Sequence, residues 1–361
     1  MKLKEIITFL ENYSPLKLQE SYDNSGLITG DINADISGIL LTIDTIEEVV
    51  DEAINKKCNL ILSHHPIIFS GIKSLTGSNY IERTIIKAIK NDIAIYAMHT
   101  NLDISNNGVN DKICEKLNLK NCKPLSYEKN LKKIITYVPD KYADKVRTAI
   151  FNAGAGHIGN YSDCSFNSKG KGSFKALENT NPFVGEKNIT HFENETKIES
   201  IFPEYLQNNI ITALKKSHPY EEVAYDIYKL DNKNNFGLGR IGVLNEKTSE
   251  KDFLKTLKKT FGGVIRYTKL LNKPIKKVAV CGGSCSFLLK NAINANADIF
   301  ISSDFKYHQF FDAENKIIIA DLGHFETEQF TKELFYDILT KKFINFAIHF
   351  SKIKTNPINY L

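Results

Sequence analysis

Alternation of short apolar segments with amphipathic ones in the N-terminal third constrains the fold most. The runs SGILLTID (37–44), NLILSH (59–64) and IAIYAMH (93–99) are short and rich in Ile and Leu, as buried strands are. The intervening segments TIEEVVDEAINKKC and YIERTIIKAIKND carry apolar residues at helical spacing. Strands separated by helices at such intervals form a parallel sheet with helices on its faces, so we predict an α/β fold.

The C-terminal third repeats this pattern. Strands are predicted at KKVAVCG, DIFISSD and IIIAD. Helices are predicted at SFLLKNAINANA and over about 326–342. The apolar run INFAIHFS follows. We therefore expect two pseudo-equivalent α/β halves that form one core.

The middle of the chain has a different composition. KKIITYVPDKY predicts a strand and a turn, several glycines then mark a loop-rich stretch, and HPYEEVAYDIYKL alternates like a strand. Because 361 residues exceed the usual size of one core, we predict an α+β domain at 128–235, inserted between α/β segments 1–127 and 236–361. The polar stretch 169–195 is expected to be a mobile loop.

Composition and charge argue against several classes of partner. The 47 basic and 42 acidic residues leave a net charge of +5, and no arginine-rich stripe with interleaved aromatic residues indicates nucleic-acid binding. No stretch approaches the roughly 20 apolar residues of a membrane span, and charges interrupt the N-terminal segment, unlike a signal peptide. We expect a cytoplasmic protein.

Six cysteines are present, without a CxxC pair. Cys281 and Cys285 flank a glycine turn at a spacing that some zinc sites use, but further ligands are not evident nearby. We expect all six to be reduced core residues.

The first candidate ligands follow two of the predicted strands. His64 and His65 come directly after NLIL, and adjacent side chains on an extended backbone point to opposite sides, so each could bind a different ion. Asp103 follows IAIYAMH and would lie at the same sheet edge. Hydrogen-bonded histidines and a helix-capping aspartate are the alternatives. Residues expected to orient these ligands are His99, Thr100 and Asn101.

The segment DLGHFETEQF supplies two more candidates. His324 and Glu328 stand four residues apart at the start of the predicted helix, on one face, where they could bind one divalent ion together; an ordinary surface pair is the alternative. Three separate segments thus place ligand-type residues beyond strand ends, where open α/β sheets bind ligands. We expect Asp304 and His308, in SSDFKYHQF, to support the ligands or contact substrate.

Imidazole and carboxylate ligands without thiolate suit two divalent ions per chain, and Zn, Mn, Fe and Ni remain open. Two ions about 3.5 to 4 Å apart can acidify a bridging water and polarise the bond that it attacks. The sequence therefore favours metal-dependent hydrolysis, with Glu328 required for turnover.

The chain resembles the family of Nif3-like dinuclear metal-centre proteins, the GTP cyclohydrolase 1 type 2 homologues. The matching pieces occur in family order over nearly the whole chain: YDNSGLITG, LILSHHPIIF, HTNLD, VCGGSCSF, ISSDFKYH, GHFETE and TNPINYL. Two positions depart from the family pattern, Tyr22, where tryptophan is usual, and Cys285, and neither is a ligand position.

This resemblance implies several properties. It assigns both ions to the same five residues, His64, His65, Asp103, His324 and Glu328. It also implies a ferredoxin-like, PII/CutA-like insert, a toroidal homohexamer and GTP cyclohydrolase-like activity.

Two functions remain open on the sequence. The first is a hydrolase acting on a nucleotide or related small molecule; no GxxxxGK[ST] loop supports GTP independently. The second is a non-enzymatic protein whose metal site serves metal delivery, sensing or partner regulation. A regulatory or nucleic-acid-associated scaffold is the weakest hypothesis, because the net charge is small and no groove-reading motif appears.

Overall fold

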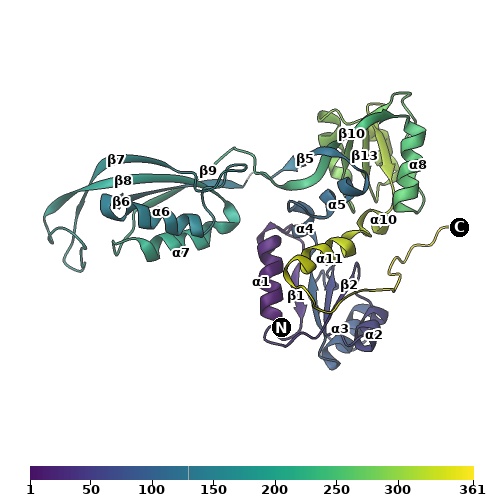
Figure 1. Ribbon diagram of the computed structural model, residues 1–361, viewed down its shortest axis with the longest axis horizontal. Helices are drawn as coiled ribbons and strands as arrows, with labels where there is room; N and C mark the ends of the chain where they lie inside the picture. Colours follow the sequence, from purple (N-terminus) through teal and green to yellow (C-terminus); the bar gives the residue numbers. More distant parts are fainter. Residues whose placement is uncertain (129) are drawn as a thin grey trace. The chain divides into compact units, whose positions relative to one another are not determined.

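The computed structural model describes residues 1–128 and 130–361; Lys129, within the predicted insert, lies outside the described residues. The chain divides into two compact units (Figure 1). Unit 1 comprises Met1–Ser126 and Phe236–Leu361, and unit 2 comprises Tyr127–Asn235. In the described part of the chain, every helix is too short or too polar to cross a membrane.

The first sheet of unit 1 has the strand order β1-β4-β3-β2-β15. Its strands are β1 (Gly26–Thr29), β2 (Ile39–Thr42), β3 (Leu60–Ser63), β4 (Ala94–Ala97) and β15 (Ile348–Phe350). All neighbours are parallel except β1 and β4. The helices of the N-terminal segment are α1 (Leu3–Tyr13), α2 (Glu47–Asn55), α3 (Tyr80–Lys90), α4 (Thr100–Ile104) and α5 (Val109–Lys116). Of these, α4 and α5 pack against β10 (Gly237–Thr248) of the second sheet. The predicted α/β class is confirmed.

The second sheet of unit 1 has the order β11-β14-β13-β12-β10-β5. Its strands are β5 (Lys120–Tyr127), β10 (Gly237–Thr248), β11 (Arg266–Tyr267), β12 (Ile275–Val280), β13 (Ile299–Ser302) and β14 (Ile318–Asp321). Strands β12, β13 and β14 are parallel, and β10 and β11 run antiparallel to their partners β12 and β14. Helices α8 (Glu250–Phe261) and α9 (Leu289–Asn294) belong to this half.

The predicted long helix over 326–342 is two helices, α10 (His324–Glu328) and α11 (Thr331–Lys342). Phe330 lies at the break, and its ring packs edge-on against Phe261, with the centroids 5.5 Å apart. This apolar contact holds the chain between the two helices against the core.

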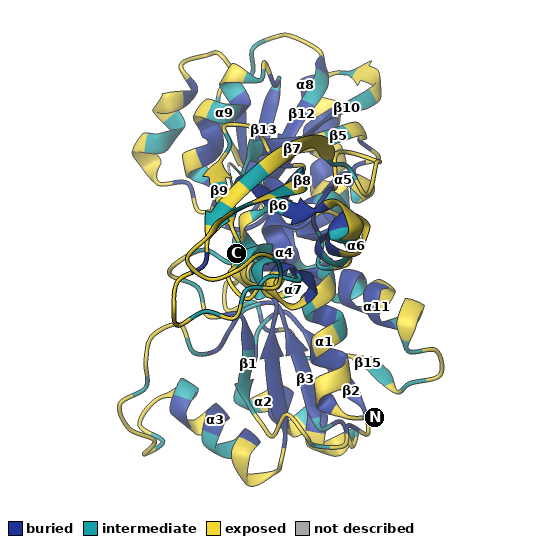
Figure 2. Cartoon of the chain, turned by 90° about the vertical axis from the view of Figure 1, so that its left-hand side faces the viewer, coloured by how far each residue is buried: buried dark blue, intermediate teal, exposed yellow. Residues whose placement is uncertain are grey.

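The two halves of unit 1 exchange strands. β5, which lies before residue 128, joins the second sheet, and β15, near residue 350, joins the first. One cluster of buried side chains spans both sheets and includes Leu3, Leu62, Val280 and Leu339. Figure 2 shows the strands of both sheets as largely buried. The halves therefore share a core.

Unit 2 contains one antiparallel sheet of order β7-β8-β6-β9. Its elements in chain order are β6 (Leu131–Pro139), α6 (Ala143–Asn152), β7 (Phe166–Lys175), β8 (Thr190–Pro203), α7 (Gln207–Ser217) and β9 (Tyr225–Lys229). Apolar residues of both helices join β6 and β8 in one core, which includes Ile134, Val146, Ile198 and Ile210.

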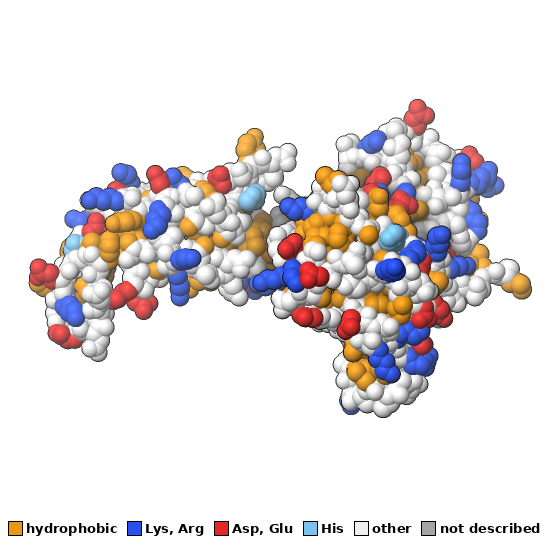
Figure 3. Space-filling model, turned by 60° about the horizontal axis from the view of Figure 1, so that its bottom comes forward, with side chains coloured by type: hydrophobic (Ala, Val, Ile, Leu, Met, Phe, Trp, Pro, Cys, Tyr) orange, Lys and Arg blue, Asp and Glu red, His pale blue; other side chains and the backbone are white. Residues whose placement is uncertain are grey.

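The predicted loop over 169–195 is a loop only in part, because residues 169–175 belong to β7 and residues 190–195 belong to β8, while 176–189 connect the two strands. β7 is an edge strand, and most of its side chains are exposed. An exposed edge strand needs no alternation of apolar residues, which removes the usual sequence signal. Figure 3 shows basic and acidic side chains mixed over the visible face of each unit.

Candidate metal centre

His64 and His65 lie where the chain turns away after β3. Both backbone N–H groups donate to the Ile43 carbonyl, at 3.1 and 2.9 Å. The two rings do not point to opposite sides, because the extended strand ends at Ser63; their centroids are 4.9 Å apart. The prediction of opposite orientations is therefore wrong, and both imidazoles face Glu328.

Glu328 presents one carboxylate oxygen to each histidine. Its Oε1 lies 3.6 Å from His64 Nε2, and its Oε2 lies 3.0 Å from His65 Nε2. His324 Nε2 is 3.2 Å from the same Oε2, and Asp103 Oδ1 is 3.9 Å from His64 Nε2. The structure thus brings together all five residues selected from the sequence.

Several of these atoms are buried without a hydrogen-bond partner in the described chain. They are His64 Nε2, Asp103 Oδ1 and Glu328 Oε2, and the Glu328 and His64 side chains are only 2% and 0% exposed. Buried polar atoms are normally paired. A divalent cation among these nitrogen and oxygen atoms would satisfy all of them, so the donor set fits a metal ion.

Each histidine is oriented through its other ring nitrogen. His64 Nδ1 lies 2.8 Å from the Met98 carbonyl, so it donates there and leaves Nε2 free to bind. His65 Nδ1 lies 2.7 Å from Asp44 Oδ1, and His324 Nδ1 lies 2.6 Å from Asp304 Oδ2. Such partners are typical of metal-binding histidines.

His99, which was predicted only to orient the ligands, lies next to His64 and His65 in the cluster itself. Its ring centroid is 5.3 Å from that of His64 and 5.2 Å from that of His65, and its Nδ1 lies 2.7 Å from Asp23 Oδ1. Two groups of side chains have the spacing of metal ligands, one formed by His64, His65 and His99 and the other by His65, His324 and Glu328.

Two carboxylates at the site, those of Asp44 and Asp23, were not predicted from the sequence. Asp44 follows β2, so its position beyond a strand end was a usable signal. Asp23 lies in a loop before β1 and offered no such signal. His308 contacts Tyr307 and is not among the residues that line the cavity described below.

Charge and burial together perturb the titration of the cluster. Burial alone would lower the pKa of His65, but the Glu328 and Asp44 carboxylates raise it to about 10. Against the same effect of burial, Glu328 and Asp304 raise the pKa of His324 to about 11. Burial would raise the pKa of Glu328, yet the surrounding histidines hold it well below its usual range. The site therefore requires compensating positive charge.

A cavity of about 840 Å³ opens beside the cluster and is lined by His65, His99, Asp103, His324 and Glu328. Its other walls are largely apolar and include Tyr22, Ile67, Phe69, Ile72, Tyr80 and Phe287. The described residues that line it include no lysine or arginine. The volume is in the range of small-molecule sites.

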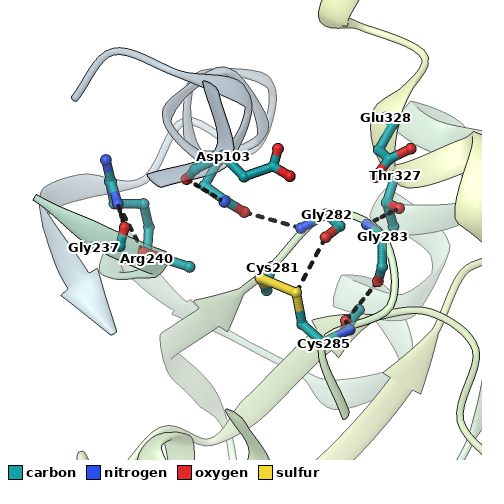
Figure 4. Close-up of a disulfide and its surroundings, with 12 residues drawn as sticks. Asp103, Gly237, Arg240, Cys281, Gly282, Gly283, Cys285, Thr327 and Glu328 are labelled. Atoms are coloured by element: carbon teal, nitrogen blue, oxygen red, sulfur yellow. Dashed lines mark hydrogen bonds between the residues drawn. A yellow bond between two sulfur atoms is a disulfide. The ribbon is translucent and has the colours of Figure 1, made fainter. Parts of the chain in front are cut away.

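The turn from Cys281 to Cys285 forms one wall of this site (Figure 4). Gly283 has a φ of +67°, and a Cβ atom there would collide with Glu328 Oε1. Its N–H donates to Thr327 Oγ1 at 3.0 Å. Only glycine leaves room for the carboxylate at this position.

Cys281 and Cys285 form a disulfide, so the expectation of six reduced cysteines is corrected. The glycine turn brings their Cα atoms to 6.0 Å, a separation that a disulfide spans. The sequence spacing alone could not show this approach.

Comparison with known proteins decides the family. The family model described as Duf34/NIF3 (NGG1p interacting factor 3) matches residues 1–357. The chain belongs to this family. A GTP cyclohydrolase 1 type 2 homolog of Halalkalibacterium halodurans is 41% identical over 364 residues, covering 99% of this chain and 98% of that protein. Its Bacillus subtilis counterpart is 39% identical over 367 residues, with the same coverage.

Among solved structures of the NIF3 family, a Bacillus cereus protein related to NIF3 is 37% identical, with a TM-score of 0.84. The match covers 100% of this chain and 99% of that one. The resemblance stated from the sequence motifs is confirmed.

Proposed function

We propose that the chain is a dinuclear metal-dependent hydrolase that acts on a nucleotide or related small molecule, in the manner of a GTP cyclohydrolase 1 type 2. The observation that carries the proposal is the position of the Glu328 carboxylate, whose two oxygens approach different histidines. Names of the relatives support the GTP assignment.

The five ligands divide into two sets around this carboxylate. His64, Asp103 and Glu328 Oε1 would hold one ion, and His65, His324 and Glu328 Oε2 would hold the other. Zn, Mn, Fe and Ni all suit such ligands. His64 is fully buried, whereas His324 is partly exposed, so the second set offers the open position that substrate or water needs.

The bound ions would activate water and polarise the bond that it attacks. The chain's own residues orient the histidine ligands and line the cavity in which substrate would bind. Asp44 and Asp304 hold their histidines with Nε2 directed at Glu328. His99, fixed through Nδ1 by Asp23, lines the cavity with its remaining ring nitrogen available to carry a proton to the leaving group.

The cavity walls indicate how a nucleotide would bind. Aromatic and aliphatic side chains such as Phe69 and Phe287 suit a flat base. No lysine or arginine is among the described lining residues, so phosphate groups would depend on the metal ions for charge compensation.

The test is metal analysis of the purified chain beside Glu328→Ala, followed by a hydrolysis screen that includes GTP with the ions found. The expected result is about two ions per wild-type chain and loss of both metal and turnover in the variant. Glu314→Ala, whose side chain is exposed and paired with Lys316, is the matched control and should behave as wild type. Absence of metal from the wild type would overturn the site assignment.

A second candidate is metal delivery, sensing or partner regulation without catalysis. The observation that favours it is unit 2, which has a core of its own and no described residue in the metal cluster. Two ions without turnover, together with metal-dependent assembly or partner binding, would select this function.

We further propose that unit 2 is a ferredoxin-like, PII/CutA-like domain, supported by its βαββαβ chain order and antiparallel sheet. The assignment of 1–127 and 236–361 to the metal-binding core is part of the same proposal. A homohexamer and a cytoplasmic location stay predictions. Analytical ultracentrifugation with and without metal tests the first.

A further inference from the structure

Unit 2 contains a second cavity, of about 600 Å³, that the metal chemistry does not use. Four aromatic side chains line it, namely Tyr137, Phe174, Phe183 and Tyr220. The centroid of Tyr220 lies 5.9 Å from that of Phe174 and 6.3 Å from that of Phe183. The Glu221 carboxylate accepts a hydrogen bond from the Asn181 N–H at 2.9 Å and so fixes the loop that carries Phe183.

The floor of this cavity is shaped by glycines of β7. Gly170 and Gly172 lie on the same face of the strand as Phe174. A Cβ atom on Gly172 would collide with the Glu195 carboxylate of the neighbouring strand β8. The absence of a side chain at this position therefore lets the carboxylate lie over the strand.

Glu195 is held in place by Tyr220. The Tyr220 hydroxyl donates to Glu195 Oε1 at 2.9 Å. Burial, and then this carboxylate, raise the pKa of Tyr220, so the hydroxyl stays protonated as the donor. The anionic oxygens thus lie beside the aromatic rings in the cavity wall.

Four lysines also line the cavity, Lys169, Lys171 and Lys175 of β7 and Lys197 of β8. Because side chains alternate along a strand, those of β7 lie on the face opposite Gly172 and Phe174. Lys171 Nζ lies over the Phe192 ring, 5.4 Å from its centroid, and Lys169 Nζ is 3.5 Å from Asp140, both on the opposite face of the hairpin. Lys197 shares the face of Glu195, but its ammonium is paired with Glu199 at 2.9 Å. The Glu195 carboxylate, bonded to the Tyr220 hydroxyl, is therefore an acidic group beside the rings that no ammonium group of the described chain pairs with.

We propose that this cavity binds a small organic cation, an amine or guanidine carried on an apolar body. Its charged group would pair with Glu195 while the faces of Phe174, Phe183 and Tyr220 surround it, because a cation is attracted to aromatic ring faces and more strongly when desolvated. The site needs no metal and is independent of the proposed hydrolase.

The experiment uses the full-length chain and three probes with the same phenyl body, namely 2-phenylethylammonium, 2-phenylethanol and phenylacetate, in saturation-transfer NMR and calorimetric titrations. The ammonium should bind roughly tenfold more tightly than the alcohol, as an ion pair with ring contacts implies. Phenylacetate should bind more weakly than either. Equal or tighter binding of phenylacetate, or no binding of the ammonium, overturns the proposal.

Variants locate the binding in the cavity. Glu195→Gln keeps the shape of the side chain but removes the charge, so the preference for the ammonium over the alcohol should disappear. Tyr220→Phe keeps the ring and should weaken the preference only in part. The control is Glu193→Gln, on the same face of the same strand, whose carboxylate is paired with His191 at 3.0 Å and does not line the cavity.

The control variant should bind all probes as the wild type does. Unchanged selectivity in Glu195→Gln, with a wild-type melting curve, would contradict the proposal. Loss of selectivity in Glu193→Gln as well would show that the probe binds elsewhere on the hairpin and would also overturn it.

Discussion

Gly283 and Glu328 lie in contact, and the space that a side chain at 283 would need is occupied by Glu328 Oε1. The carboxylate that both proposed ions share is thus positioned by a residue that has no side chain. We therefore expect Gly283 to be as necessary to the proposed site as its charged members.

Gly283→Ala should therefore lower metal affinity by at least about tenfold, because the new methyl group displaces the shared carboxylate. Competitive titration against a chelator measures this. Gly262→Ala is the control, since Gly262 also has a positive φ, of +79°, but no atom lies within 4 Å of its added Cβ. Equal metal affinity in the two variants would contradict the role of the contact.

Asp304→Asn should weaken metal binding roughly 10- to 100-fold, as loss of a carboxylate partner of a ligating histidine typically does. The variant removes the negative charge that orients His324 through Nδ1. Inductively coupled plasma mass spectrometry after dialysis against graded chelator gives the loss, with the exposed Asp312→Asn as control. Full metal retention in Asp304→Asn would show that His324 does not ligate.

Metal binding should release protons and strengthen as the pH rises. In the metal-free chain the pKa of His65 is about 10 and that of His324 about 11, so both are protonated near neutrality and an ion must displace those protons. Calorimetry in buffers of different ionisation enthalpy counts the protons. Binding that is independent of pH from about pH 6 to about pH 9 would exclude these histidines as ligands.

The same shifts predict how the metal-free fold responds to alkali. The folded-state pKa values of both histidines exceed the unfolded value of about 6.5, so their contribution is complete below that value and is lost as the pH rises towards about 10 to 11. The melting temperature of the metal-free chain should fall across this window, while that of the loaded chain should fall less. Thermal scans at several pH values compare the two forms.

Arg240→Leu should destabilise unit 1 by about 3 kcal/mol, because it leaves three backbone carbonyls without their donor and the partly exposed Asp111 carboxylate without its partner. Arg240 is 2% exposed and donates to both Asp111 oxygens at 2.8 Å and to the carbonyls of Gly237, Gly239 and Ser105. Urea unfolding measures the change. Arg83→Ala breaks an exposed pair with Glu47 and should cost about 0 to 1 kcal/mol.

GTP should bind the chain more tightly than guanosine only when metal is present, because no lysine or arginine is among the described residues of the cavity wall. Stripping the metal should reduce the affinity for GTP to that for guanosine, whereas guanosine binding should change little. Fluorescence titration of both ligands, before and after chelation, tests this. Undiminished GTP binding after chelation would place the triphosphate elsewhere.

Much of the centre was predictable because its residues follow strands that have clear apolar patterns. His64, Asp103 and His324 each follow a buried strand of parallel pairing, and the carboxyl ends of such strands meet. The α/β class followed from the same periodicity.

The rest depended on tertiary contacts that leave no local pattern. The turn that rotates His65 towards Glu328 and the loop that carries Asp23 have no periodic signal. The hairpin of β7 was missed because an exposed edge strand of Gly, Lys and Ser carries little strand propensity. The helix break near Phe330 depends on packing against the distant Phe261. The Cys281–Cys285 disulfide depends on the conformation of the turn between the two cysteines.

The exchange of strands between the two halves of unit 1 also bears on biosynthesis. β2 emerges early from the ribosome, but its parallel neighbour β15 is among the last segments to be made. The edge of β2 that pairs with β15 therefore stays open during most of translation. Every strand of the unit 2 sheet is synthesised before β15. We expect unit 1 to be completed only after translation is nearly finished, with unit 2 already present.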